Sequence, residues 1–162
     1  MNFEEVYSQI SDDIQMNKDE ALKLFCCAKM VLKGGIIVEI GTFRGGSAII
    51  MAAATEANIY SIDIASEVIE KVKDFPNIKF IQGDSKEISI TWDKGIEMLF
   101  IDGDHTFEGV QKDIINWAPK VKAGGIICFH DYGSRPELTR AITLSLEKRI
   151  GLPDNSLLAI IK

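Results

Sequence analysis

The sequence has few of the residues that build disulfide frameworks and metal-binding clusters. Its 162 residues include only 3 cysteines and 2 histidines. Cys26 and Cys27 are adjacent, and Cys128 lies far along the chain. This spacing indicates neither a disulfide framework nor a zinc site, because zinc ligands come in converging groups.

An excess of basic charge and long hydrophobic runs are also absent. The chain has 18 Lys and Arg against 24 Asp and Glu, for a net charge of −6. We therefore expect no nucleic acid and no membrane as partner. Apolar runs such as residues 48–54 are far shorter than the roughly 18 residues of a spanning helix, and the acidic N-terminus does not resemble a signal peptide. A cytoplasmic location is the expectation.

Segments typical of strands and helices alternate along the chain. Apolar, β-branched runs predict strands at 36–40, 59–62, 78–81, 96–101, 126–129 and about 157–161. Helical patterns precede the first strand and lie between the others at about 45–57, 65–73, 107–118 and 134–149. This alternation predicts an α/β fold: a Rossmann-like, doubly wound, mostly parallel sheet with helices on both faces. We expect one domain over 1–162, in which 1–32 form a helical cover.

The helix boundaries rest on capping signals. Asn17 with Glu20, and Ser134 with Glu137, have the spacing of capping boxes. In the 107–118 helix, the apolar positions share one face and Asp113 lies outside it. After 149 there is room for one clear strand, so we expect a sheet shortened at its C-terminal side. An open sheet edge would make a homodimer plausible.

A glycine-rich segment follows the first predicted strand and indicates a ligand loop. Glycines between 41 and 46 allow close approach of a ligand to the start of the next helix. Phe43 stands where a dinucleotide fingerprint has its middle glycine, which argues against a nicotinamide dehydrogenase. Glu39 precedes the loop and suits an ammonium or sulfonium ligand. Asp63 and Asp84 end the next two strands, where they can accept from ribose hydroxyls and from an adenine amine.

These features together resemble the class I S-adenosylmethionine-dependent methyltransferases. The resemblance is carried by Val38-Glu39-Ile40-Gly41 through Ser47, by Asp63 and by Gly83-Asp84-Ser85, and it covers about residues 17–133. Within that class, residues 100–108 and 124–132 are similar to the small-molecule branch related to macrocin O-methyltransferase and cephalosporin hydroxylase-type proteins.

The resemblance implies roles for individual residues. Glu39 and the 41–47 loop would hold the methionine part of S-adenosylmethionine, Asp63 the ribose, and Asp84 with Ser85 the adenine. The full set of implied cofactor-binding residues is Glu39, Gly41, Thr42, Phe43, Gly45, Ser47, Asp63, Ile64, Asp84, Ser85 and Asp102.

The resemblance also implies a divalent metal and a base. Asp102, Asp131 and His130 would hold Mg²⁺, or a softer ion such as Mn²⁺, Fe²⁺ or Zn²⁺ if His130 is a ligand. The metal would lower the pKa of an acceptor hydroxyl, and His105 would take its proton. Asp102 and His105 are therefore the catalytic candidates.

Structural explanations remain open for several of these residues. Asp63 and Asp84 could be ordinary caps at strand–helix junctions, and we expect Asp104 to make a cap or turn hydrogen bond. His105 is as consistent with a solvated loop histidine as with a base. The leading function is O-methylation of a small-molecule acceptor, a sugar or secondary metabolite. The alternatives are an inactive cofactor-binding module and a hydroxylase-like enzyme on the same scaffold.

Overall fold

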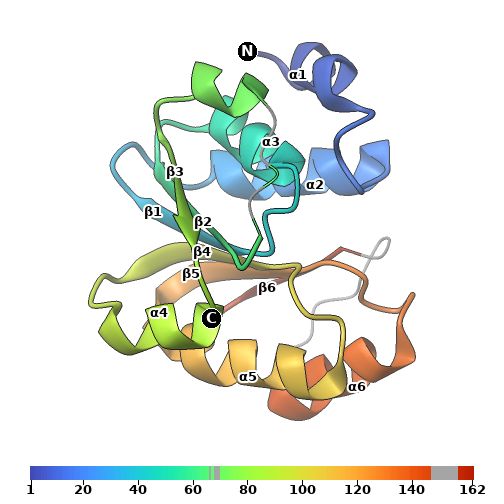
Figure 1. Cartoon of the computed structure of the whole chain (residues 1–162), viewed down its shortest axis with the longest axis vertical. Coiled ribbons are helices and arrows are strands. Elements are labelled where there is room, and N and C mark those ends of the chain that lie inside the picture. The colour runs from blue at the N-terminus through green and yellow to red at the C-terminus, as the bar shows by residue number, and fades with distance from the viewer. Residues whose placement is uncertain (66, 68–69, 147–156) are drawn as a thin grey trace.

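The computed structural model describes residues 1–65, 67, 70–146 and 157–162, which form a six-stranded sheet between two layers of helices (Figure 1). The strand order is β3-β2-β1-β4-β5-β6. β6 runs antiparallel to β5, and the other pairings are parallel. The strands are β1 (Ile36–Ile40), β2 (Asn58–Asp63), β3 (Ile78–Gln82), β4 (Ile96–Ile101), β5 (Val121–Phe129) and β6 (Leu158–Ile161).

Helices cover both faces of the sheet (Figure 1). On one face lie α1 (Phe3–Ile10), α2 (Lys18–Lys29) and α3 (Gly46–Ala54). The other face carries α4 (Ser85–Thr91), α5 (Phe107–Trp117) and α6 (Pro136–Ser145). Two short 3₁₀ helices, η1 (Glu70–Asp74) and η2 (Ala118–Lys120), complete the connections. The predicted Rossmann-like, doubly wound architecture is confirmed.

β1 shows why the sequence folds in this way. Ile37 belongs to the apolar cluster under α2 and α3, whereas its neighbour Val38 belongs to the cluster under α5 and α6. Both side chains are fully buried. A strand that is covered on both faces needs a continuous apolar run rather than an alternating one, which is the pattern that predicted it.

The strand order reverses between β1 and β4, which is the topological switch point of the sheet. From β1 the chain passes through α3 to β2 on one side, whereas β4 pairs with β1 on the other side. In a doubly wound sheet, a ligand crevice lies at the carboxyl ends of the two strands that flank this point. The Gly41 N–H donates to the Ile62 carbonyl (2.9 Å), and the Asp102 N–H donates to the Ile40 carbonyl (2.8 Å). These two bonds fix the start of the loop after each strand.

Some sequence predictions of local structure are wrong. In the described part of 65–73, the structure has the 3₁₀ helix η1 in place of a helix; residues 66, 68 and 69 lie outside the described residues. α4 was not predicted, because it is only seven residues long. β5 begins at Val121 rather than 126. The first half of β5 contains Gly124 and Gly125, a pair that is typical of a turn.

The two predicted capping boxes have different outcomes. The box formed by Asn17 and Glu20 is present at the start of α2. At α6 the N-cap is Arg135 and makes no side-chain cap bond, because the Ser134 hydroxyl instead donates to the main-chain carbonyl and side chain of Asp131. The predicted extension of this helix to residue 149 lies outside the described residues beyond 146.

The N-terminal helices lie against the start of α3. A Cβ on Gly46 would come within 2.8 Å of Ile14 Cβ, so the α1–α2 connection packs directly on this turn. Arg44 forms an ion pair with Asp13 (2.9 Å) across the same contact. Among the described residues, no helix is long and apolar enough to cross a membrane.

Gly41→Ala should destabilise the protein strongly. Gly41 has φ +93°, and a Cβ there would lie 2.1 Å from the Asp102 carbonyl oxygen. The strain and the clash should together cost about 3 kcal/mol or more in urea unfolding. Gly124→Ala is the control: its φ is +79° but nothing lies within 4 Å of the added Cβ, so only about 1 kcal/mol is expected. Equal losses in the two variants would contradict the close packing at Gly41.

Candidate active site

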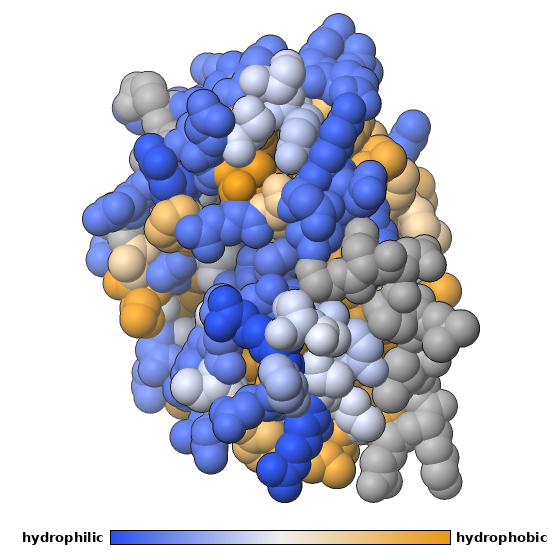
Figure 2. Space-filling view, turned by 90° about the vertical axis from the view of Figure 1, so that its right-hand side faces the viewer, coloured by the Kyte–Doolittle hydropathy of each residue, from blue (hydrophilic) through white to orange (hydrophobic). Residues whose placement is uncertain are grey.

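A cavity of about 700 Å³ opens at the carboxyl ends of the parallel strands. Its walls come from the loops after β1, β2, β3 and β4, from α5, and from the α1–α2 connection. This volume lies within the range of cavities that bind cofactors and small ligands. Figure 2 shows the molecule from the side of the loops that follow β4 and β5, where hydrophilic residues predominate.

Most of the predicted cofactor-binding residues line this cavity. They are Gly41, Thr42, Phe43, Ser47, Asp63, Ile64, Asp84, Ser85 and Asp102. The lining also includes residues 13–16, of the predicted N-terminal cover, and the predicted base His105. Glu39 and Gly45 are not among the lining residues, and neither are His130 and Asp131.

Asp63 organises the loop after β1. Its Oδ2 accepts hydrogen bonds from the backbone N–H groups of Thr42 and Phe43, both at 2.8 Å. Gly45, with φ +91°, is the N-cap of α3, and its N–H closes the turn onto the Thr42 carbonyl (2.8 Å). Phe43 has φ +48° and is 52% exposed. A carboxylate has about four acceptor sites, so Asp63 can bind this loop and still accept from ligand hydroxyls.

Glu39 lies behind the cavity wall and not in it. The residue is fully buried, and its carboxyl accepts hydrogen bonds from the Ser47 and Ser61 hydroxyls. Burial raises the pKa of Glu39 to about 8; the two hydroxyls oppose this shift, and the charges of Asp102 and Asp63 add to it. The group is thus a buried carboxyl that supports Ser47, and Ser47 itself meets the cavity.

At the opposite end of the cavity, α4 and α5 meet. Asp84 is the N-cap of α4 and accepts from Lys86 N–H (2.9 Å), so its structural explanation holds. The Ser85 hydroxyl donates to Asp113 Oδ1 (2.6 Å), and Trp117 Nε1 donates to the Ser85 carbonyl (3.2 Å). Asp113, predicted to lie outside the apolar face of α5, is nevertheless buried: the residue is 3% exposed, and this burial raises its pKa.

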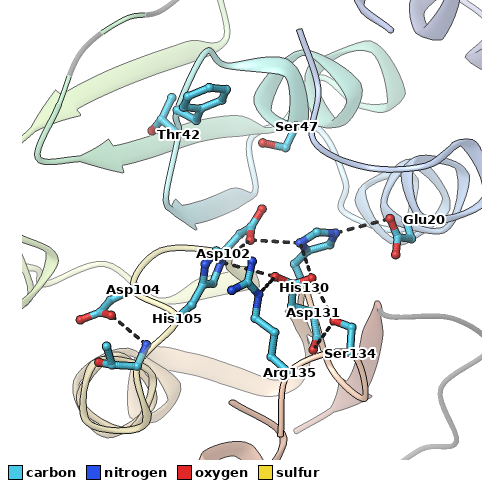
Figure 3. Close-up of polar contacts among 12 residues, drawn as sticks. Glu20, Thr42, Ser47, Asp102, Asp104, His105, His130, Asp131, Ser134 and Arg135 are labelled. Atoms are coloured by element: carbon cyan, nitrogen blue, oxygen red, sulfur yellow. Dashed lines mark hydrogen bonds and ion pairs between the residues drawn. The ribbon is translucent and has the colours of Figure 1, made fainter. Parts of the chain in front are cut away.

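A cluster of acidic and histidine side chains converges beside the cavity (Figure 3). Asp102 and His105 come from the segment after β4, and His130 and Asp131 from the end of β5. The measured contacts are His130 Nδ1 to Asp102 Oδ1 (3.1 Å), His105 Nε2 to Asp102 Oδ1 (3.5 Å) and His105 Nε2 to Asp131 Oδ2 (3.6 Å). Asp104 points away and accepts from Thr106 N–H (2.9 Å), which is the predicted turn bond.

Glu20 is a member of this cluster that sequence reasoning missed. Its Oε2 lies 3.4 Å from His130 Nε2 and also accepts from Asn17 N–H (2.9 Å). The side chain is buried although it sits in the first turn of α2. The sequence pattern around Glu20 is that of an ordinary capping box. It contains no local signal that separates this buried glutamate from an exposed capping glutamate.

His130 carries a positive charge at neutral pH. Burial alone would lower its pKa, but the hydrogen bond to Asp102 and the charges of Asp102, Asp131 and Glu20 outweigh that effect and raise the pKa to about 9. In the protonated form, both nitrogens of an imidazole are donors. Both ring nitrogens therefore serve as donors to carboxylates.

The predicted metal ligands do not fit a divalent ion in this arrangement. Both ring nitrogens of His130 face carboxylates, Nδ1 that of Asp102 and Nε2 that of Glu20. Asp131 accepts from Arg135 Nε (2.6 Å) and the Ser134 hydroxyl (3.0 Å). No group of three or more His, Cys, Asp or Glu side chains within the described residues is arranged to hold a metal. The protein's own cations, His130 and Arg135, neutralise the carboxylates that a metal would need. We therefore assign no chemical step to a metal.

Glu39→Gln should make the stability of the cofactor-free protein less dependent on pH. The folded-state pKa of about 8 lies above the unfolded value of about 4.3. The folded state therefore keeps the extra proton, and stability present below pH 4 is lost as pH rises toward 8. In urea unfolding from pH 5 to 8.5, the variant should gain on the order of 3 kcal/mol relative to the wild type. Glu56→Gln, at an exposed glutamate, is the control: its free energy of unfolding should vary with pH in parallel with the wild type. The same parallel behaviour in Glu39→Gln would contradict the raised pKa of Glu39.

Comparison with known proteins identifies the family. Residues 38–132, more than half of the chain, match the family model described as a methyltransferase domain. The uncharacterized protein R132 of Acanthamoeba polyphaga mimivirus is 35% identical over 111 residues, which are 59% of this chain and 50% of the relative. The chain thus spans about half the length of that relative.

Solved structures share the fold. The O-methyltransferase NovP superposes with a TM-score of 0.72 at 18% identity, over 90% of this chain and 80% of NovP. SMU.1697c, a putative methyltransferase from Streptococcus mutans solved in complex with SAH, gives 0.72 at 13% identity, over 92% and 99% of the two chains. The resemblance found in the sequence is confirmed, and the chain belongs to the methyltransferase-domain family and has the fold of the S-adenosylmethionine-dependent methyltransferases.

Proposed function

We propose that the protein transfers a methyl group from S-adenosylmethionine to a hydroxyl of a small-molecule acceptor. The observation that carries the proposal is one cavity that contains both Asp63 with its organised loop and the His105–Asp102 pair. A cofactor bound to Asp63 and its loop would present its methyl group near the His105–Asp102 pair. NovP, which shares the fold, is an O-methyltransferase.

The charge around the cavity suits a sulfonium ligand. Asp63 and Asp102 line the cavity, and their charges contribute to the raised pKa of Glu39 behind it. A positively charged ligand is favoured where carboxylates crowd one another, because it relieves their repulsion. In this proposal Asp63 accepts from the ribose hydroxyls, and Ile64 packs against the adenine ring. Ser47 and the 41–45 turn contact the methionine part of the cofactor.

The acceptor side of the cavity supplies a base. The acceptor hydroxyl gives its proton to His105 Nδ1, because Nε2 faces two carboxylates and carries the ring hydrogen. Its oxygen attacks the methyl carbon; the carbon–sulfur bond breaks, and the electron pair stays on sulfur. Asp102 and Asp131 lie 3.5 and 3.6 Å from His105 Nε2 and stabilise the imidazolium that forms. His130 holds Asp102 in place. Alignment of the two substrates supplies most of the acceleration.

Cofactor affinity tests the binding half of this proposal. Calorimetric titration of the full chain should show binding of S-adenosylmethionine, and Asp63→Ala should weaken it about 10- to 100-fold through loss of charged hydrogen bonds. Asp93→Ala, at an exposed aspartate outside the cavity, is the control and should bind like the wild type. Absence of binding by the wild type at millimolar cofactor would refute the proposed function.

Turnover tests the chemical half. With a panel of catechols, vicinal diols and glycosides, His105→Gln should lower the rate about 10²- to 10⁴-fold without weakening S-adenosylhomocysteine binding, as expected for loss of a base. A chelator such as EDTA should leave the wild-type rate unchanged. If EDTA abolishes turnover, the metal-free mechanism is wrong. If the wild type binds cofactor but methylates nothing in the panel, the protein behaves as a binding module.

A further inference from the structure

Asp113 is a buried carboxyl that the proposed chemistry does not use. It lies on α5, two turns from the loop that carries His105, and lines the cavity although only 3% of the residue is exposed. Taking a carboxyl out of water is costly unless it is hydrogen-bonded. Its presence in the cavity wall therefore calls for a partner.

The protein supplies only part of that partnership. Ser85 donates to Asp113 Oδ1, and within the described residues we find no second hydrogen-bond partner for the carboxyl, so Oδ2 keeps its acceptor capacity. Trp117, one turn further along α5, holds the Ser85 carbonyl. Two side chains of α5, Asp113 and Trp117, thus bond to Ser85. These bonds fix the position of the Asp113 carboxyl at the cavity wall.

Asp84, the predicted partner of the adenine amine, is in a different situation. Its side chain is exposed and caps α4 through Lys86 N–H. Hydrogen bonds discriminate better in a low-dielectric surrounding than in water, because an unpaired buried group has no solvent to replace the lost partner. Of the two carboxyls at this end of the cavity, Asp113 is the better suited to recognise a ligand.

We propose that Asp113, positioned by Ser85, accepts a hydrogen bond from the 6-amino group of the cofactor's adenine and so selects adenosyl ligands. The inference rests on the proposed function. With the ribose on Asp63, the base lies toward the loops after β2 and β3, where Ile64, Gly83 and Ser85 line the cavity. The exocyclic amine is the hydrogen-bond donor of adenine, and a carboxyl oxygen is a matching acceptor.

The titration of Asp113 is compatible with this role. Burial raises its pKa, and the hydrogen bond from Ser85 and the charge of Lys86 oppose the shift. In the protonated form the carboxyl can donate to adenine N1 while its other oxygen accepts from the amine. Both protonation states therefore accept from the amine.

Ligand selectivity distinguishes recognition from a merely structural role. The probes are S-adenosylhomocysteine and its 6-deamino analogue, in which hydrogen replaces the amine, titrated calorimetrically into the full chain. The wild type should prefer S-adenosylhomocysteine about 10- to 100-fold. Asp113→Ala should lose most of that preference, by weakening S-adenosylhomocysteine and leaving the analogue nearly unchanged. Asp113→Asn keeps an acceptor oxygen and should restore the preference.

Controls separate this inference from the proposed function. Asp84→Ala should change the affinity for both ligands by the same factor and leave their ratio intact. If Asp113→Ala proves too unstable in thermal unfolding, Asp113→Ser replaces it, since it removes the carboxyl but keeps a polar hydroxyl at this buried position. Unchanged selectivity in the Asp113 variants overturns the inference while the proposed function stands. No binding of either ligand by the wild type overturns the proposed function.

Discussion

The close contact between Gly41 and Asp102 is the constraint on which the rest of the site depends. A Cβ at Gly41 would lie 2.1 Å from the Asp102 carbonyl oxygen, so the loop after β1 and the segment after β4 run directly against each other. The first carries the backbone groups that Asp63 organises, and the second carries Asp102 and His105. The parallel sheet therefore places a cofactor loop and an acid–base pair in one cavity without any long connection.

Electrostatics gives this cavity its character. Carboxyls line it, and behind its wall burial raises the pKa of Glu39 to about 8, with a smaller contribution from the charges of Asp102 and Asp63. Asp102, in the cavity wall, pairs with His130, and Asp131, beside the cavity, pairs with Arg135. An internal imidazolium thus stands where the sequence suggested a metal ion, and the cavity itself remains negative. A sulfonium cofactor complements that remaining charge.

The sequence predicted the fold well because apolar periodicity reports burial on both faces of a sheet, as Ile37 and Val38 show. It failed where a helix is too short for a period to be read, as in α4. It also failed where a capping side chain has another local partner, because the Ser134 hydroxyl bonds to Asp131 instead of capping α6. At the site, strand ends located Asp63 and Asp102, since topology alone brings them together. Glu20 and Asp113 were missed, because the burial of each is set by a partner on another element.

The most direct test of this account is a crystal structure of the protein grown with S-adenosylhomocysteine and MnCl₂, with anomalous data collected for manganese. The account predicts the ribose on Asp63, the sulfur facing His105, and no manganese peak among Asp102, His130 and Asp131. A nucleoside bound elsewhere, or a manganese ion held by those three side chains, would contradict it.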